Sequence, residues 1–111
     1  MCAVDAGRLV HPDAVRAQCE GNLVWGLGMV FTDTLPLNGT GVAATGFDDA
    51  PIPRLPEVPA IEIVLVDEGD PPGGAGETAI VGAAAAVANA WHDASGRRLT
   101  RLPLTAAERA A

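Results

Sequence analysis

Apolar residues between Pro12 and Phe31 recur at intervals of three and four positions, which is the spacing of one face of an α-helix. We therefore expect a packed helix over this range. Pro12 suits its first position, and Asp13 falls in its first turn, near the positive end of the helix dipole. The expected buried stripe consists of Leu23, Val24, Leu27, Val30 and Phe31.

Glycine interrupts this expected helix three times, at Gly21, Gly26 and Gly28. Each glycine inside a helix costs up to about 1 kcal/mol relative to alanine. Glycines kept in spite of that cost indicate close approach by another backbone or by a ligand. A loosely wound helix end is the alternative, and the sequence does not decide between the two.

A second helix is expected over residues 79–95, where alanine and valine fill most positions. The segment is apolar on nearly all sides, with Asn89 as its main polar interruption, so we expect most of its surface to be buried. Gly96 suits the residue that follows such a helix in a left-handed conformation.

Short strands are expected elsewhere. The clearest is Ala60–Asp67, which is rich in β-branched residues, and Cys2–Val10 has the pattern of a short strand around a turn. The segment 34–44 predicts a hairpin with Asn38-Gly39 as its two-residue turn, because both positions accept a positive φ. Four prolines in residues 46–59 indicate an extended connector. Together these elements predict an α+β fold of short strands with two packed helices.

The composition indicates a unit that needs more protein around it. At 111 residues the chain is one small domain or a piece of a larger one, and its apolar residues are mostly alanine and valine. Alanine buries little surface, and burial stabilises by roughly 25 cal/mol per Å², so the core is expected to be thin. The net charge of −7 and the absence of lysine argue against a nucleic-acid partner, because such binding depends on clustered basic residues.

The sequence shows no targeting or metal-binding signal. No apolar run approaches the roughly 20 residues of a membrane span, and the first residues lack the pattern of a signal peptide. A cytoplasmic location is therefore the default expectation, and the periplasm stays open for a complete enzyme. Cys2 and Cys19 are too few and too far apart for a metal knuckle, so no metal ligands are expected, and nothing supports a disulfide between them.

The stretch PPGGAGETAI, residues 71–80, places a lone carboxylate between a glycine-rich loop and the apolar segment. The small residues before Glu77 are Gly73, Gly74, Ala75 and Gly76. Such a loop can bind an oxyanion at a helix N-terminus, but it matches no nucleotide fingerprint, and the residues alone favour an ordinary tight turn. Glu77 either stabilises the helix start or, if the apolar segment desolvates it, serves as a general base.

Other polar residues carry weaker signals. The amide of Gln18 both donates and accepts, which suits a heterocyclic ligand, although alone it would be assigned to the surface. His11 and His92 favour capping or surface roles over metal ligation. The pair Asp48-Asp49 favours a solvated turn over a metal or acid/base site.

Several stretches, taken in order, resemble one family. Residues 3–28 read AVDAGRLVHPDAVRAQCEGNLVWGLG and resemble the AVD-G-RVVNPD-VRAQ-EG…GL stretch of molybdenum hydroxylases. Residues 47–77 resemble the later stretch that leads to the Gly-x-Gly-Glu motif, and residues 83–104 resemble the closing helix and tail. The chain thus looks like a C-terminal part of the molybdopterin-binding large subunit in the xanthine dehydrogenase/aldehyde oxidase family, of the isoquinoline 1-oxidoreductase type. The motifs are specific in combination, although each is weak alone.

The resemblance implies roles for the matching residues. Glu77 corresponds to the base beside the molybdenum, which removes a proton as a water-derived oxygen is added to an aldehyde or N-heterocyclic carbon. Gln18 corresponds to the glutamine that hydrogen-bonds the pterin. The backbone of Gly73, Gly74, Ala75 and Gly76 would line the cofactor side of the pocket. The redox chemistry belongs to the cofactor, expected as molybdenum–molybdopterin in a dinucleotide form. Thr78 stands where many relatives have proline, which alters the helix start but keeps the carboxylate.

The resemblance also predicts that this chain acts inside a larger assembly. The family's large subunit is several times longer, and its earlier glycine-rich segments and a further glutamine at the metal have no counterpart here. We expect residues 1–104 to be the C-terminal segment of a molybdopterin-binding domain and residues 105–111 to be a flexible tail, with no cofactor held and no activity in isolation. Expected partners are the rest of the large subunit, an iron–sulfur subunit, a flavin or cytochrome subunit, and a small-molecule substrate. Two alternatives are a separate small subunit of a split enzyme and a non-catalytic structural or interaction domain left by truncation.

Overall fold

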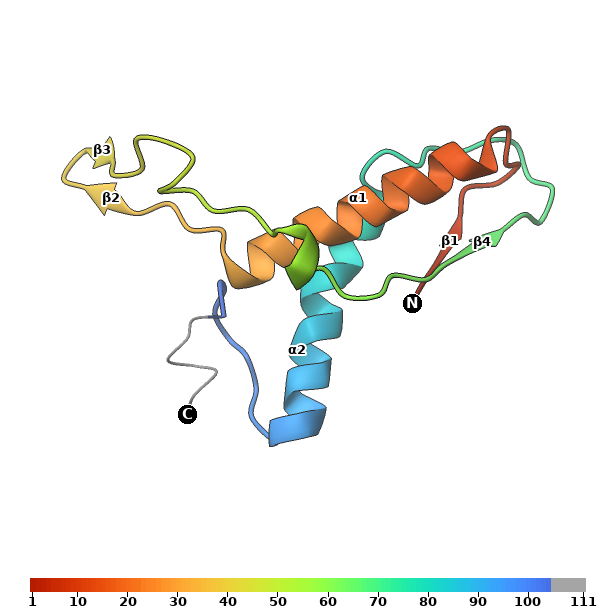
Figure 1. Cartoon of the computed structure of the whole chain (residues 1–111). Helices are drawn as coiled ribbons and strands as arrows, with labels where there is room; N and C mark the ends of the chain where they lie inside the picture. The colour runs from red at the N-terminus through yellow and green to blue at the C-terminus, as the bar shows by residue number, and fades with distance from the viewer. Residues whose placement is uncertain (105–111) are drawn as a thin grey trace.

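The computed structural model describes residues 1–104, which form two helices and two pairs of short strands (Figure 1). Helix α1 spans Pro12–Phe31 and helix α2 spans Val81–Ser95. Strands β1 (Cys2–Asp5) and β4 (Ile63–Val66) pair in parallel, with Cys2 opposite Ile63 and Asp5 opposite Val66. The remaining elements are β2 (Leu37–Asn38), β3 (Gly41–Val42) and the short 3-10 helices η1 (Leu55–Glu57) and η2 (Thr78–Ile80). The predicted α+β class is confirmed. The predicted segment 105–111 lies outside the described residues.

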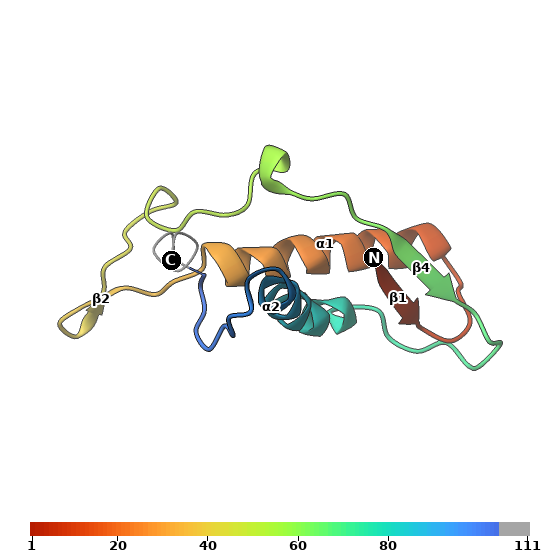
Figure 2. The ribbon, with the colours of Figure 1, turned by 90° about the horizontal axis from the view of Figure 1, so that it is seen from below.

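The molecule is extended rather than compact. The β1–β4 pair lies beside the N-terminal half of α1, and the β2–β3 hairpin projects beyond its C-terminal end (Figures 1 and 2). The radius of gyration is 16.7 Å, whereas a compact domain of about this length has a value of about 13 Å. The small core cluster joins Val4, Cys19, Ile63 and Ala79. The predicted thin core is therefore present.

Helix α1 has the predicted limits because its start is fixed by local chemistry. The Nδ1 atom of His11 accepts the backbone N–H of Ala14 at 3.1 Å, and Pro12 and Asp13 occupy the first turn. The capping role considered for His11 is thus confirmed. The helix ends at Phe31, and the backbone N–H of the following residue, Thr32, caps it by donating to the Gly28 carbonyl at 2.8 Å.

The buried face of α1 differs from the predicted stripe. Of the five expected residues only Val30 is buried; Phe31 is exposed and the other three are half-buried. The residues that α1 does bury are Cys19, Asn22, Gly26, Gly28 and Val30. The face is rotated because α2 and Pro53 pack on the glycine side of the helix, where a neighbouring segment can come closest.

Two of the three helical glycines serve this close approach. A Cβ built on Gly26 would lie 2.5 Å from the Cβ of Ala83 in α2, and one on Gly28 would lie 3.2 Å from the Cδ of Pro53. A Cβ on Gly21 would have nothing within 4 Å among the described residues. Close approach by another part of the chain is therefore the correct interpretation at Gly26 and Gly28.

The strands are shorter than predicted, and the hairpin turn lies one residue later. Leu37 pairs with Val42 and Asn38 with Gly41, so the turn consists of Gly39 and Thr40. Gly39 has a φ of 63°, and no non-glycine residue of the described chain has a positive φ. A turn that needs positive φ only at its first central position fits glycine there, which explains the shift from the predicted Asn38-Gly39.

Helix α2 is far more exposed than its composition predicts. Ala83 is its one buried residue in the described structure, and Val81 is 81% exposed. The expectation of burial on most sides is wrong for this chain, because within residues 1–104 α2 is covered mainly where it crosses α1 (Figure 2). Its predicted end is confirmed: Gly96 has a φ of 71° and donates its N–H to the His92 carbonyl at 2.7 Å.

Candidate functional site

The glycine-rich loop is anchored to the end of β1 by backbone contacts. The N–H of Gly73 donates to the Ala6 carbonyl at 2.8 Å, and the N–H of Arg8 donates to the Asp70 carbonyl at 2.8 Å. Gly7 has a φ of 64°, and a Cβ on it would collide with the Pro71 carbonyl oxygen. Glycine at position 7 is therefore required by this loop-to-loop packing.

Two amide side chains of α1 reach the next part of the loop. The Nε2 atom of Gln18 lies 3.4 Å from the Gly76 carbonyl oxygen, and the Nδ2 atom of Asn22 lies 2.9 Å from the same oxygen. Residues four apart lie on the same face of a helix, so both amides point toward one carbonyl. The structure thus brings together Gln18 and the loop residue Gly76, which are 58 positions apart in the sequence.

Asn22 is the residue of this site that the sequence did not indicate. It is 7% exposed, and its Nδ2 atom also donates to the Gln18 backbone carbonyl at 2.7 Å. Because Nδ2 faces two carbonyl oxygens, the orientation of the amide is fixed by its partners. Its Oδ1 atom is buried without a hydrogen-bond partner among the described residues. The available signal was a polar side chain on the glycine face of the helix, one turn after Gln18.

The outer part of the loop is open. Neither Gly74 nor Gly76 has a positive φ, and a Cβ on either would have nothing within 4 Å in the described structure. Conformation and crowding within residues 1–104 therefore do not explain glycine at these two positions. Ala75 between them is half-buried, and Gly73 is held close to Ala6.

Glu77 follows this loop directly and precedes η2 and α2. Its side chain is exposed and makes no capping hydrogen bond to the helical segment. The expectation that the apolar segment would desolvate this carboxylate is wrong for residues 1–104, because α2 is itself exposed. What the structure does place is the backbone of Glu77, one peptide bond after the carbonyl that Asn22 and Gln18 contact.

The remaining candidate residues lie apart from this loop. Asp49 accepts hydrogen bonds from the backbone N–H and the hydroxyl of Thr45, both at 3.0 Å, and these two donors hold the pKa of its carboxyl below the usual value. A solvated turn is thus the correct interpretation of Asp48-Asp49. Within residues 1–104, no three His, Cys, Asp or Glu side chains are grouped to hold a metal ion. No described helix is long and apolar enough to cross a membrane.

Comparisons with known proteins agree on one family. The family model described as the molybdopterin cofactor-binding domain matches residues 1–59. A nicotinate dehydrogenase subunit of Pseudomonas putida is 40% identical over 103 residues, which cover 92% of this chain and 9% of that protein. The beta subunit of isoquinoline 1-oxidoreductase from Brevundimonas diminuta is 31% identical over 103 residues, which cover 93% of this chain and 13% of that protein.

A solved structure shares the fold. Quinoline 2-oxidoreductase from Pseudomonas putida 86 superposes with a TM-score of 0.82 at 24% identity, over 96% of this chain and 15% of that one. The chain therefore spans less than one sixth of the length of each of these three proteins.

Proposed function

The chain belongs to the molybdenum hydroxylase family, within its molybdopterin cofactor-binding domain, and on that premise we propose that it contributes the general base Glu77 and part of the pterin pocket to a larger oxidoreductase. One observation carries the proposal. The amides of Gln18 and Asn22 meet the carbonyl of Gly76, the residue bonded to Glu77. Two motifs far apart in the sequence thereby form one surface.

The residues of this surface fit a hydrogen-bonding heterocycle such as the pterin. Gln18 is exposed, and its contact to Gly76 is long at 3.4 Å, so its amide can turn to donate to and accept from a ligand. Gly74 and Gly76 leave open space in which a ring can lie against the backbone. The molybdenum cofactor supplies the two-electron redox chemistry when it is bound.

The tasks left to the protein are binding and proton transfer. Gln18 and the backbone of residues 73–76 orient the cofactor, and the Glu77 carboxylate accepts a proton from the water-derived oxygen as it is transferred. The proposed substrate is an aldehyde or an N-heterocyclic aromatic compound, and the names of two relatives, which specify nicotinate and isoquinoline, support the N-heterocyclic class. We also propose that the pterin cofactor is in a dinucleotide form.

The exposed surface of the chain supports its dependence on more protein. Helix α2 is apolar yet exposed, and the shape is open. Hydrophobic surface of this kind marks an interface. We infer that residues 1–104 pack against the rest of a large subunit, with an iron–sulfur subunit and a flavin or cytochrome subunit as further partners, and that the isolated chain neither holds the cofactor nor turns over substrate. The cytoplasm is the proposed location, and the periplasm is the alternative for the assembled enzyme.

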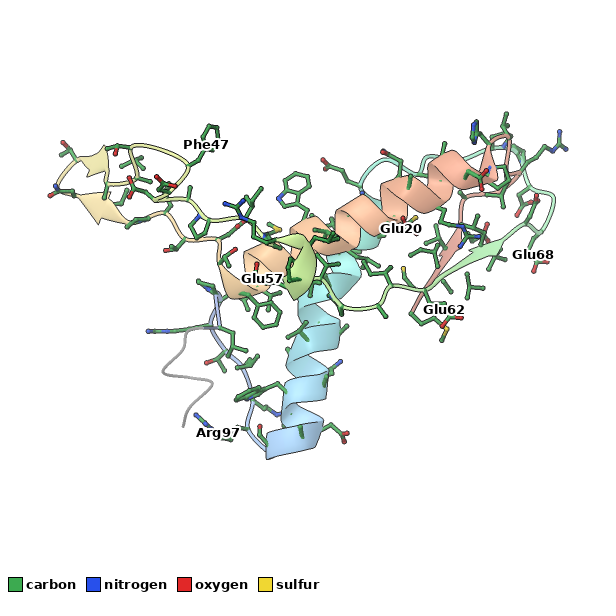
Figure 3. The ribbon with its side chains drawn as sticks, viewed as in Figure 1. Glu20, Phe47, Glu57, Glu62, Glu68 and Arg97 are labelled. Atoms are coloured by element: carbon green, nitrogen blue, oxygen red, sulfur yellow. The ribbon has the colours of Figure 1, made fainter. Side chains whose placement is uncertain are left out.

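The test replaces Glu77 by Gln in the assembled enzyme that contains this sequence. Loss of the base is expected to lower kcat by about 10²- to 10⁴-fold, with the molybdenum content unchanged. Glu68→Gln is the matched control, because Glu68 is exposed on the loop that follows β4 (Figure 3). Unchanged turnover in Glu77→Gln would contradict the catalytic role and favour the structural alternative.

A further inference from the structure

Asn22 is the buried contact between α1 and the loop that carries Glu77. We propose that Asn22 is a positioning residue: its amide holds the Gly76–Glu77 peptide on α1, so that the Glu77 carboxylate keeps its place while Gln18 is released to bind the cofactor. This inference rests on the proposed function.

The geometry separates the two amides that reach Gly76. The Asn22 contact is 2.9 Å long and made by a buried side chain, whereas the Gln18 contact is 3.4 Å long and made by an exposed one. Asn22 is further held by its second bond, to the Gln18 carbonyl at 2.7 Å. The Asn22 bond is therefore the permanent one, and the Gln18 bond is the one that a ligand can replace.

The held atom controls Glu77 directly. The Gly76 carbonyl belongs to the planar peptide that ends at the Cα of Glu77, so fixing this peptide fixes the position of that Cα and of its N–Cα bond. The Glu77 side chain then has only its own φ and side-chain torsions left to vary. Gly74 and Gly76 have no neighbours at the Cβ position in the described structure and give this loop the conformational freedom of glycine. A loop of this kind needs an external hydrogen bond to keep a base within the tolerance that catalysis requires.

The unpaired atom of Asn22 supports a role other than stability. Its Oδ1 is buried without a donor in the described structure, and burial of an unsatisfied acceptor is unfavourable. Stability alone would favour an apolar side chain of the same size at this position. The two donor bonds of Nδ2 are what such a side chain would lack.

The experiment compares Asn22→Leu with Asn89→Leu in the assembled enzyme. Both variants make the same chemical change on a helix, but Asn89 is exposed on α2 and lies outside the site. Asn22→Leu is expected to speed amide hydrogen exchange of Gly73 and Ile80, whose N–H groups are hydrogen-bonded on either side of the held peptide, about tenfold. It is also expected to lower kcat by about 10- to 100-fold, with KM and molybdenum content unchanged. Asn22→Asp, which keeps the size and removes the donors, is expected to behave like Asn22→Leu. Asn89→Leu is expected to leave all four readouts unchanged.

Three results would overturn the inference. Unchanged exchange at Gly73 and Ile80 in Asn22→Leu would show that Asn22 does not hold the loop, and faster exchange with unchanged kcat would show that holding the loop does not serve catalysis. A joint loss of molybdenum and substrate affinity in both Asn22 variants would assign Asn22 a general structural role. The two proposals fail separately, because full activity of Glu77→Gln overturns the proposed function, whereas the exchange measurement tests the tether whatever Glu77 does.

Discussion

The contact between Gly26 and Ala83 offers a sharp test of how the two helices are held together. A Cβ on Gly26 would lie 2.5 Å from the Ala83 Cβ, 3.4 Å from the Ile80 Cγ1 and 3.5 Å from the Ile80 carbonyl oxygen. Alanine at position 26 gains about 1 kcal/mol of helix propensity, but overpacking at a contact without rotatable atoms costs about 1 to 3 kcal/mol. Gly26→Ala is therefore expected to destabilise the α1–α2 contact by up to about 2 kcal/mol.

Gly21→Ala is the matched control, because position 21 lies on the same helix and a Cβ there meets no described atom within 4 Å. This variant keeps the propensity gain and is expected to stabilise α1 by about 1 kcal/mol. Native-state hydrogen exchange of the α1 and α2 amides in the assembled protein measures the local free energy of opening of both helices for both variants. Adding Ala83→Gly to Gly26→Ala is expected to relieve the collision. A gain in protection for Gly26→Ala equal to that for Gly21→Ala would refute direct packing of α2 on the backbone of α1.

Two further predictions concern titrating groups. Burial, and then the neighbouring Cys2 and Glu20, raise the pKa of the Cys19 thiol above 9.0, so at about pH 8 iodoacetamide is expected to modify Cys2 well before Cys19. Because the pKa of Cys19 is higher in the folded than in the unfolded chain, the stability linked to the neutral thiol is present below about pH 9 and is lost as the pH rises through the raised pKa. Equal alkylation rates of Cys2 and Cys19 would contradict the burial of Cys19. The pKa of Asp49 is lowered from 3.8 by the Thr45 N–H and hydroxyl, so its turn keeps this stabilisation above that pH and loses it as the pH falls through the lowered pKa. Thr45→Val is expected to move the NMR titration midpoint of the Asp49 carboxyl back upward, and an unmoved midpoint would exclude the hydroxyl bond.

Local chemistry explains which parts of the fold the sequence could predict. The limits of α1 follow from Pro12 and Asp13, and the end of α2 follows from Gly96, because each signal acts within one turn of the residue concerned. The buried face of α1 could not be derived in this way. The buried face depends on which part of the chain approaches the helix. Gly26 and Gly28 let α2 and Pro53 approach from a side that carries few apolar side chains, so the spacing of apolar residues does not predict that this side is buried.

The candidate site, like the fold, could be predicted from the sequence only in part. A motif match suggested Gln18 and Glu77 separately, whereas their connection through the Gly76 carbonyl depends on tertiary packing across 58 positions. The sequence signal for Asn22 was too weak to single it out, because an asparagine inside a helix is ordinarily a surface residue and its contact lies 54 positions away. Its role became visible once the burial of its side chain and the direction of its amide were known.

The exposure of Glu77 and the exposure of α2 have a common cause under the proposed function. Thr78 and Val81, which follow the carboxylate, border a groove of about 330 Å³ between β1 and the start of α2, and Val81 is 81% exposed. Protein that fills this groove and covers the first turn of α2 would also remove water from beside Glu77, and desolvation of a carboxylate strengthens it as a base. The same contact would therefore bury apolar surface and prepare the proton acceptor. On this reasoning Val81→Asp is expected to weaken assembly and to lower kcat together, whereas Glu77→Gln is expected to lower kcat alone. Assembly is measured by co-purification. Normal assembly of Val81→Asp would separate the two effects and refute the common cause.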